Sequence, residues 1–91
     1  MATKEERAAL LKAIEEDGPD VLAEADDSLK ADREVVLAAV KQNGGALRGA
    51  AKALQGDREI VLAAVMQDGD ALELASEELQ QDEELKKIAE G

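Results

Sequence analysis

Apolar side chains recur along this chain in blocks that repeat every 25 residues. The stretch DREVVLAAVKQNGGAL at residues 32–47 returns as DREIVLAAVMQDGDAL at residues 57–72. A weaker copy precedes both, over about residues 4–31, with one residue inserted near Pro19. A fixed period of this length is typical of repeat architectures, in which neighbouring units bury each other's apolar surface.

The ends of each apolar block predict where a helix begins and ends. Thr3, Asp32 and Asp57 precede the blocks and suit helix N-caps, because their side chains accept hydrogen bonds from free backbone N–H groups of the first turn. A glycine follows each block, and a left-handed glycine commonly ends a helix. We therefore expect positive φ at the three glycines Gly18, Gly44 and Gly69.

A second, shorter helix is expected in each copy, at about residues 20–29, 45–54 and 70–80. A last helix is expected at about residues 83–90. The segment VVLAAV has the composition of a buried strand, but its Asp cap, its Asn-Gly end and its two alanines favour a helix.

The apolar positions also predict which helices are buried. The first helix of the second copy carries apolar residues around most of its circumference: Val35, Val36, Leu37, Ala39 and Val40. A helix that is apolar on several sides is buried on several sides. The second helices have a single apolar stripe, so we expect the first helices inside the molecule and the second helices outside.

Together these elements predict one all-α domain over residues 1–91, built of helical hairpins that stack right-handed as a short α-solenoid or compact bundle of six or seven helices. Its parts are a divergent repeat 1 at about 4–31, repeat 2 at 32–56, repeat 3 at 57–81 and a C-terminal capping helix at 82–91. That last helix has charged side chains where the third copy has Val or Leu, at Lys86, Lys87 and Glu90. We expect these charges to end the stack. Because short helices are marginal alone, weak self-association is also expected.

The residue types present favour a non-enzymatic protein. The chain has no His and no Cys, so a Ser–His or Cys–His relay, a disulfide and a thiolate metal site are all excluded. Carboxylates are plentiful, but the chain has no aromatic residue that would exclude water from a carboxylate and raise its pKa. We expect no catalytic residue and no cofactor.

Two acidic turns invite a metal-site interpretation, at residues 17–20 and 68–70. An EF-hand loop needs oxygen ligands at several alternating positions and a distal Glu, and neither turn supplies them. A helix end followed by a helix start accounts for both turns, so we expect no metal. The stretch Gln42–Gly45 is no phosphate loop, because the lysine of such a loop is absent.

The formal net charge of −11 argues against direct nucleic-acid binding. No apolar run approaches the roughly 18 residues of a membrane span, and the N-terminal stretch has no signal-peptide core. A soluble, intracellular protein, cytoplasmic by default, is therefore expected.

Positive charge is concentrated in the second copy, which lies between two acidic ones. Two interpretations stay open. In the first, Lys52 pairs with Asp27 and Glu77, and Arg48 with Glu73, because these residues fall at equivalent positions of neighbouring copies. In the second, three cations form a docking patch for an acidic partner: Lys41, Arg48 and Lys52.

The pattern D-R-E-V-V-L-A-A-V-K-Q-N-G-x-A-L, followed by A-x-x-x-L, resembles the short helical repeat known as domain of unknown function 4116. Residues 32–81 match it closely and residues 4–31 loosely. Members of that family commonly carry aromatic residues after the Asn-Gly and in the second helix, where this chain has Gly45, Asp70, Gly49 and Leu74. The resemblance implies an all-helical repeat fold and no assigned activity.

Lacking catalytic residues, the chain is expected to be a protein-interaction or scaffold module that meets its protein partner through its second helices or its loops. One alternative is an acidic mimic of nucleic acid that inhibits a basic protein. Another is an excised or engineered repeat segment without a separate function.

Overall fold

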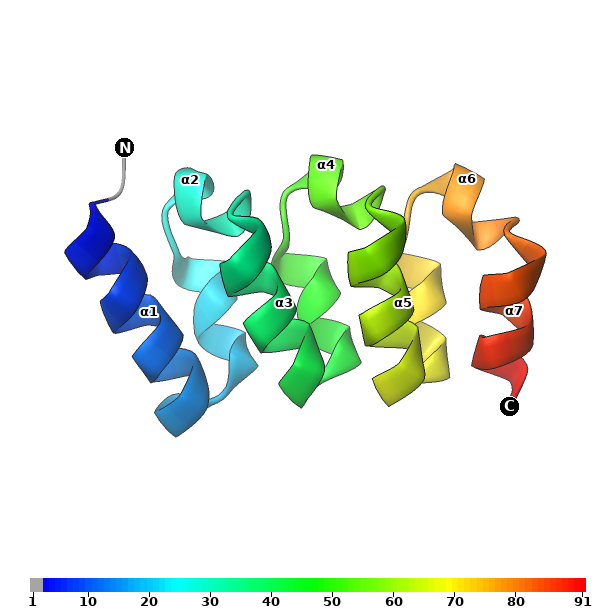
Figure 1. The fold of residues 1–91 in the computed structure, drawn as a ribbon, viewed down its shortest axis with the longest axis horizontal. Coiled ribbons are helices and arrows are strands. Elements are labelled where there is room, and N and C mark those ends of the chain that lie inside the picture. Colours follow the sequence, from blue (N-terminus) through cyan, green and yellow to red (C-terminus); the bar gives the residue numbers. More distant parts are fainter. Residues whose placement is uncertain (1–2) are drawn as a thin grey trace.

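The structure of the chain, a computed structural model, describes residues 3–91, and every regular element in that range is helical (Figure 1). The all-α prediction is confirmed. The described range contains ten helices, of which three are 3₁₀ helices (η). In chain order they are α1 (Lys4–Asp17), η1 (Pro19–Glu24), α2 (Asp27–Lys30), α3 (Arg33–Gln42), η2 (Gly44–Gly49), α4 (Lys52–Gln55), α5 (Arg58–Gln67), η3 (Gly69–Leu74), α6 (Glu77–Gln80) and α7 (Glu83–Glu90).

The helices form two layers. The long helices α1, α3, α5 and α7 lie side by side, and η1, η2 and η3 lie behind them (Figure 1). The one-turn helices α2, α4 and α6 follow one edge, where the long helices begin. The molecule measures 39 × 23 × 16 Å along its principal axes. The solenoid classification and its handedness stay predictions.

The long helices begin where the sequence predicts, because their N-caps are in place. The side chain of Thr3 accepts from the N–H of Glu6, and the side chains of Asp32 and Asp57 each accept from two N–H groups of their own first turns. These caps satisfy backbone donors that have no partner inside the helix.

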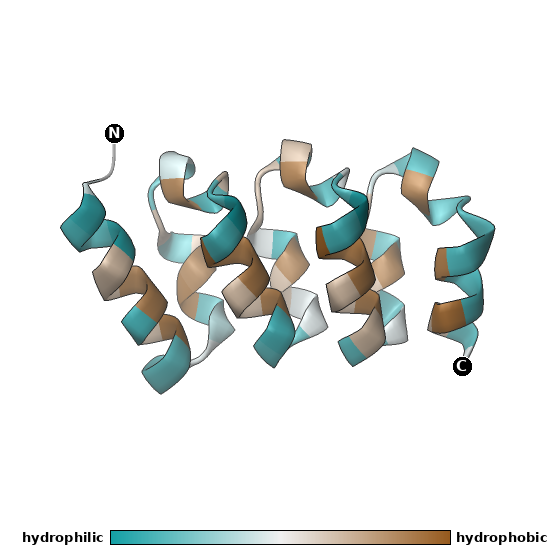
Figure 2. Cartoon of the chain, viewed as in Figure 1, coloured by the Kyte–Doolittle hydropathy of each residue, from teal (hydrophilic) through white to brown (hydrophobic). Residues whose placement is uncertain are grey.

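One apolar core lies between the two layers. Its fully buried large side chains come from both layers: Ile14, Leu22, Val35, Val36, Val40, Leu47, Ile60, Val61 and Leu85. The apolar residues of α7 lie on its side toward α5 (Figure 2). Both layers therefore contribute to the same core, and both have an outer face.

The predicted burial of the long helices is partly wrong. Leu37 and the equivalent Leu62 are only partly buried, whereas Val35, Val36, Ala39 and Val40 are buried as expected. α3 and α5 have a long helix on both sides, and α1 and α7 have one on a single side. A 3₁₀ helix lies behind each long helix, but nothing within residues 3–91 covers the outer face of this layer. The first helices are thus one layer of two and not the inside of the molecule.

The predicted second helix is also wrong, because in each copy it is two pieces. In the second copy, Ala50 and Ala51 are extended, with ψ of 152° and 150°, and they separate η2 from α4. The extended backbone lets the N–H of Ala51 donate to the carbonyl of Lys30 in the preceding copy, at 3.0 Å. Ser76 donates in the same way to Gln55, also at 3.0 Å. A bond between copies thus replaces a helical one, and the total of six or seven helices is wrong.

Glutamine side chains donate hydrogen bonds to backbone carbonyl groups beside the break. The Gln55 Nε2 donates to the carbonyls of Leu47 and Ala50, at 3.1 and 3.3 Å. Gln80, at the equivalent position of the third copy, donates to Glu73 and Ala75. Each glutamine therefore braces the bend inside its own copy.

The prediction of left-handed glycines holds only at Gly18, where φ is +101°. Gly44 and Gly69 do not have positive φ, so the prediction is wrong there. Their role is close approach. A Cβ on Gly44 would lie 2.3 Å from the carbonyl oxygen of Ala64, and one on Gly69 would lie 2.3 Å from that of Ala89. These glycines let a 3₁₀ helix contact the backbone of the next long helix.

The extra residue of the first copy lies within α1 and not near Pro19. η1 and η2 both have six residues, so they differ by no insertion. From Arg7 to the C-cap Gly18 is eleven positions, whereas from Arg33 to the C-cap Asn43 is ten.

Replacing Gly44 with Ala should destabilise the protein by about 1–3 kcal/mol, because the new methyl group would overlap a backbone oxygen. Gly56→Ala is the matched control. A Cβ at Gly56 meets its neighbours at 3.7 Å or more, and this substitution should be neutral or slightly stabilising. Urea unfolding of both variants measures the difference. Equal unfolding midpoints would contradict the close approach.

Candidate functional site

Three arginines link the starts of the long helices into a ladder. Each extends from the first half of one long helix to the N-cap aspartate of the next, and its Nε donates at 2.5, 3.0 and 3.2 Å along the chain. Each also contacts a glutamate in the first turn of that next helix. The contacts join Arg7 to Asp32 and Glu34, Arg33 to Asp57 and Glu59, and Arg58 to Asp82 and Glu84.

Each ladder aspartate has two roles at once. Asp57 caps α5 by accepting from the N–H groups of Glu59 and Ile60, at 3.0 and 3.2 Å, and it accepts from Arg33 with its other oxygen. Partial burial of the Asp57 carboxylate by itself would raise its pKa. The hydrogen bonds from Arg33 and from the backbone of Ile60 outweigh that effect, so the pKa is lowered.

The other two ladder aspartates behave alike. The pKa of Asp32 is lowered because its bonds to Arg7 and to the Val35 N–H outweigh its burial. The pKa of Asp82 is lowered by the Leu85 N–H first and by Arg58 second. All three carboxylates are therefore held in the charged form, which is the form that both caps and pairs.

The ladder was not predicted from the sequence, although a signal for it is present. The triplet Asp-Arg-Glu opens the second and third copies, and the last helix opens with Asp82-Glu83-Glu84. Glu83 stands where the other triplets have the arginine. α7 therefore has no arginine at the position that donates in the other copies.

The ion pairs that the sequence predicts are wrong. Within residues 3–91, every ion pair is made by Arg7, Arg33 or Arg58, so Arg48 and Lys52 take no part in one. Copies do exchange ion pairs, but between the N-terminal ends of the long helices. Equivalent positions of neighbouring copies do not meet there. Each arginine instead contacts the two residues on either side of its own equivalent.

The three residues of the predicted docking patch lie on three different elements. Lys41 is near the end of α3, and Lys52 begins α4, which lies at the edge where the long helices start. The structure therefore places Lys41 and Lys52 at opposite ends of the long helices. Arg48 lies in η2, in the middle of the 3₁₀ layer. All three side chains are exposed.

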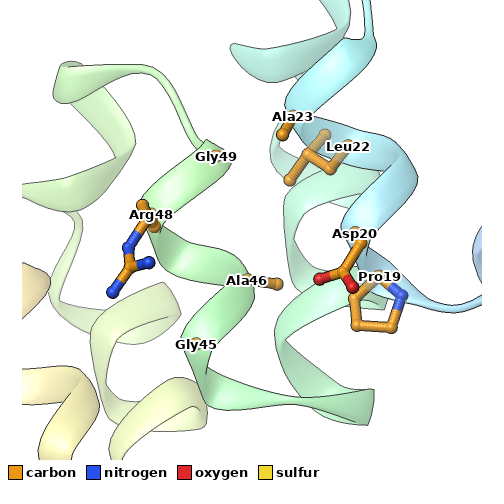
Figure 3. Close-up of a pocket in the computed structure, with 8 residues that line it drawn as sticks. All are labelled: Pro19, Asp20, Leu22, Ala23, Gly45, Ala46, Arg48 and Gly49. Atoms are coloured by element: carbon orange, nitrogen blue, oxygen red, sulfur yellow. The ribbon is translucent and has the colours of Figure 1, made fainter.

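Arg48 lies between two shallow grooves of the 3₁₀ layer. The first groove, of about 160 Å³, runs between η1 and η2 and is walled mostly by small residues (Figure 3). It is lined by Pro19, Asp20, Leu22, Ala23, Gly45, Ala46, Arg48 and Gly49. The guanidinium group of Arg48 points away from η1, toward the second groove.

The second groove, of about 270 Å³, lies between η2 and η3 and is lined by Gly45, Arg48, Asp68, Asp70, Ala71, Glu73 and Leu74. A third groove, of about 320 Å³, lies between η3 and α7 and is lined by Gly69, Asp70, Leu72, Glu73, Gln80, Ala89 and Glu90. Three carboxylates line the second groove together with Arg48, and three line the third groove without a cation.

These grooves are open and modest in size. Small-molecule pockets usually enclose roughly 300–1,000 Å³ and bury most of the ligand. A shallow groove with exposed backbone and carboxylates is better suited to side chains of another macromolecule. In the described range, no set of three His, Cys, Asp or Glu residues is placed to hold a metal ion. Within the same range, no helix combines the length and apolar character that crossing a membrane requires.

Comparison with known proteins gives one match. A family model described as Domain of unknown function (DUF4116) matches residues 10–55 and 57–89. The resemblance drawn from the repeated Asp-Arg-Glu pattern is thereby confirmed. No curated protein and no solved structure matches the chain.

Asp57→Ala and Asp57→Asn separate the two roles of a ladder aspartate. Ala removes both the cap and the ion pair and should cost about 1–2 kcal/mol of unfolding free energy. Asn caps a helix nearly as well as Asp, so it should cost about 0–1 kcal/mol, the value of an exposed ion pair. Chemical denaturation measures both. An Asn variant as unstable as the Ala variant would show that the cap contributes nothing.

Acid should remove the stabilisation that the ladder provides. The pKa of Asp57 is lower in the folded chain than in the unfolded one, so its contribution is fully present above the unfolded value of about 4. It is lost as the pH falls through that value and then through the folded pKa. The difference in unfolding free energy between the natural chain and Arg33→Gln should therefore shrink between about pH 5 and pH 2.

Urea titrations of both chains at several pH values measure that difference. Using the difference cancels the general relief of negative charge that acid gives to a chain of net charge −11. A difference that stays constant with pH would show that Arg33 does not act through the aspartate.

Proposed function

The chain belongs to the DUF4116 family, a domain of unknown function, and we propose that it acts as a non-enzymatic protein-interaction or scaffold module. The observation that carries the proposal is the position of Arg48. This cation makes no ion pair within residues 3–91, lies between two grooves and is exposed at the middle of the 3₁₀ layer.

The framework behind Arg48 supports a binding role. The arginine ladder and the backbone bonds from Ala51 and Ser76 tie the copies together, so the side chains on η2 and η3 project from fixed elements. A backbone that is already fixed loses little entropy on binding. The broad face of the molecule, 39 by 23 Å, is on the order of the ~800 Å² that each protein covers in a standard interface.

The 3₁₀ layer is a better binding surface than the outer face of the long helices. Arginine is enriched among residues that dominate interfaces. The arginines of the long helices already pair within the chain, whereas Arg48 does not. On the outer face, Met66 is the one large apolar side chain that is mostly exposed in the described part of the chain.

A non-enzymatic role is favoured by the residue types. The chain has no His and no Cys to serve as a base or a nucleophile, and its three hydroxyl side chains are therefore without the partner that activates them. We accordingly propose no reaction, and we assign the grooves to protein side chains.

A second candidate, an acidic mimic of nucleic acid, is favoured by one row of carboxylates. Glu34, Glu59 and Glu84 lie at equivalent positions of α3, α5 and α7, with side chains 76, 71 and 67 % exposed. Each contacts an arginine of the preceding copy, so the row presents much less free negative charge than a phosphate backbone does. This candidate predicts partner affinity that falls steeply with added salt.

Capture of binding proteins tests the first candidate. The chain, immobilised, is exposed to an extract of its source cells beside two variants, Arg48→Glu and Lys12→Glu. Both substitutions change the net charge by the same amount, and Lys12 is an exposed residue of α1 outside the three grooves. We expect one protein to be retained by the natural chain and by Lys12→Glu, and to be reduced at least tenfold by Arg48→Glu.

Circular dichroism should show the same helical content in all three chains, since both residues are exposed. Retention of no protein by the natural chain, or equal retention by Arg48→Glu, would contradict an interaction through the 3₁₀ layer.

A further inference from the structure

The third groove repeats the geometry of the first, with one wall missing. Gly69, Asp70, Leu72 and Glu73 line the third groove, and their equivalents fifty positions earlier line the first: Pro19, Asp20, Leu22 and Ala23. In the first groove the opposite wall is η2. No 3₁₀ helix within residues 3–91 lies at the corresponding place beside η3.

Exposure of one leucine marks the missing wall. Leu22 and Leu47 are completely buried, because the following 3₁₀ helix covers each of them. Leu72, at the equivalent position, is only partly buried. Its exposed apolar surface is the surface that a further helical turn would cover.

An open backbone acceptor accompanies that leucine. The carbonyls of Lys30 and Gln55 each accept an N–H from the copy that follows. The equivalent carbonyl, that of Gln80, receives no such bond in the described part of the chain. The third groove thus offers an apolar floor together with a backbone acceptor at its side.

The charge of the groove shows what could fill it. Asp70, Glu73 and Glu90 line it, and no cation does, since Lys86 and Lys87 of α7 are not among its lining residues. In the ladder, Glu83 also stands where the other copies have an arginine. An occupant must therefore bring positive charge to this end of the molecule.

A second copy of this chain does not meet that requirement. The segment that would enter the groove by the same geometry is η1, which carries Asp20 and Glu24 and no basic residue. Two acidic walls would repel each other. In the first groove, the corresponding position is filled by η2, which contributes glycines, an alanine and Arg48.

We propose that the third groove seats a helical turn of a partner protein that carries small residues toward Leu72 and a Lys or Arg toward Asp70 and Glu73. This inference rests on the proposed interaction function and names the class of partner segment that the third groove would hold. The third groove should accept small residues because the first groove, its equivalent, is shallow. A Cβ added at Gly49 would lie 3.4 to 3.6 Å from Ala23 and Leu22.

Two peptides from the chain itself provide matched probes. Residues 41–55 contain η2 and α4 and carry three basic and no acidic side chains. Residues 66–80 are the equivalent segment of the next copy and carry five acidic and no basic side chains. Each peptide is titrated into the full chain labelled with ¹⁵N, and the backbone amide signals are followed.

We expect saturable shifts from the basic peptide at Gly69, Leu72 and Ala89, and no saturable shifts from the acidic one. Glu73→Lys should weaken binding of the basic peptide at least tenfold. Glu24→Lys makes the same charge change on η1, outside the third groove, and should leave the affinity within twofold.

Three results would overturn the proposal. They are equal binding of the two peptides, absence of saturable shifts at the third groove, and a concentration-dependent dimer in sedimentation that Glu73→Lys abolishes. The last would assign the groove to a second copy. If the peptide fails while Arg48→Glu still abolishes protein capture, only the third groove is misassigned; if both tests fail, the interaction function is wrong as well.

Discussion

No copy in this chain can bury its own apolar surface, and the single core that the copies share is the constraint on which the structure depends. Helices of ten residues are marginal in water by themselves. The fully buried side chains come from all four long helices and from the 3₁₀ layer, in one cluster. Burying each large aliphatic side chain contributes roughly 1.5–3 kcal/mol, so a few of them outweigh the whole ladder of exposed ion pairs.

The ladder matters for register more than for free energy. An arginine that meets an N-cap aspartate fixes where one long helix starts relative to the last. Gly44 and Gly69 impose a second fixed distance at the other end of the same helices, because only glycine allows that contact with the next backbone. The bonds from Ala51 and Ser76 add a third. Three specific contacts around a non-specific apolar interface select one way of stacking, and they hold the grooves in place.

Much of the fold follows from the sequence, because local signals agree with the global arrangement. The caps at Thr3, Asp32 and Asp57 and the apolar blocks behind them locate the long helices. The second helices could not be predicted as two pieces, since their break at Ala50 is stabilised by a hydrogen bond to the preceding copy. The roles of Gly44 and Gly69 were missed for the same reason: the atom that excludes a side chain belongs to the next copy.

The candidate site was predictable only in part. Charge counting identified Arg48, Lys41 and Lys52, but it could not show that Lys41 and Lys52 lie at opposite ends of the long helices. Pairing residues at equivalent positions gave the wrong ion pairs. Each ladder arginine instead pairs with the N-cap aspartate of the next long helix, which is not its equivalent position. The grooves depend on 3₁₀ geometry, which the pattern of the second helices did not reveal.

Native-state hydrogen exchange across α3, η2 and α5 tests the shared core most directly. If neighbouring copies hold each other folded, the slowest amides of α3 and α5 open with the same free energy and the same dependence on urea, as one cooperative unit. Opening of α5 at a free energy several kcal/mol below that of α3, with α3 and η2 still protected, would show a copy that stands without its neighbour and would contradict this account.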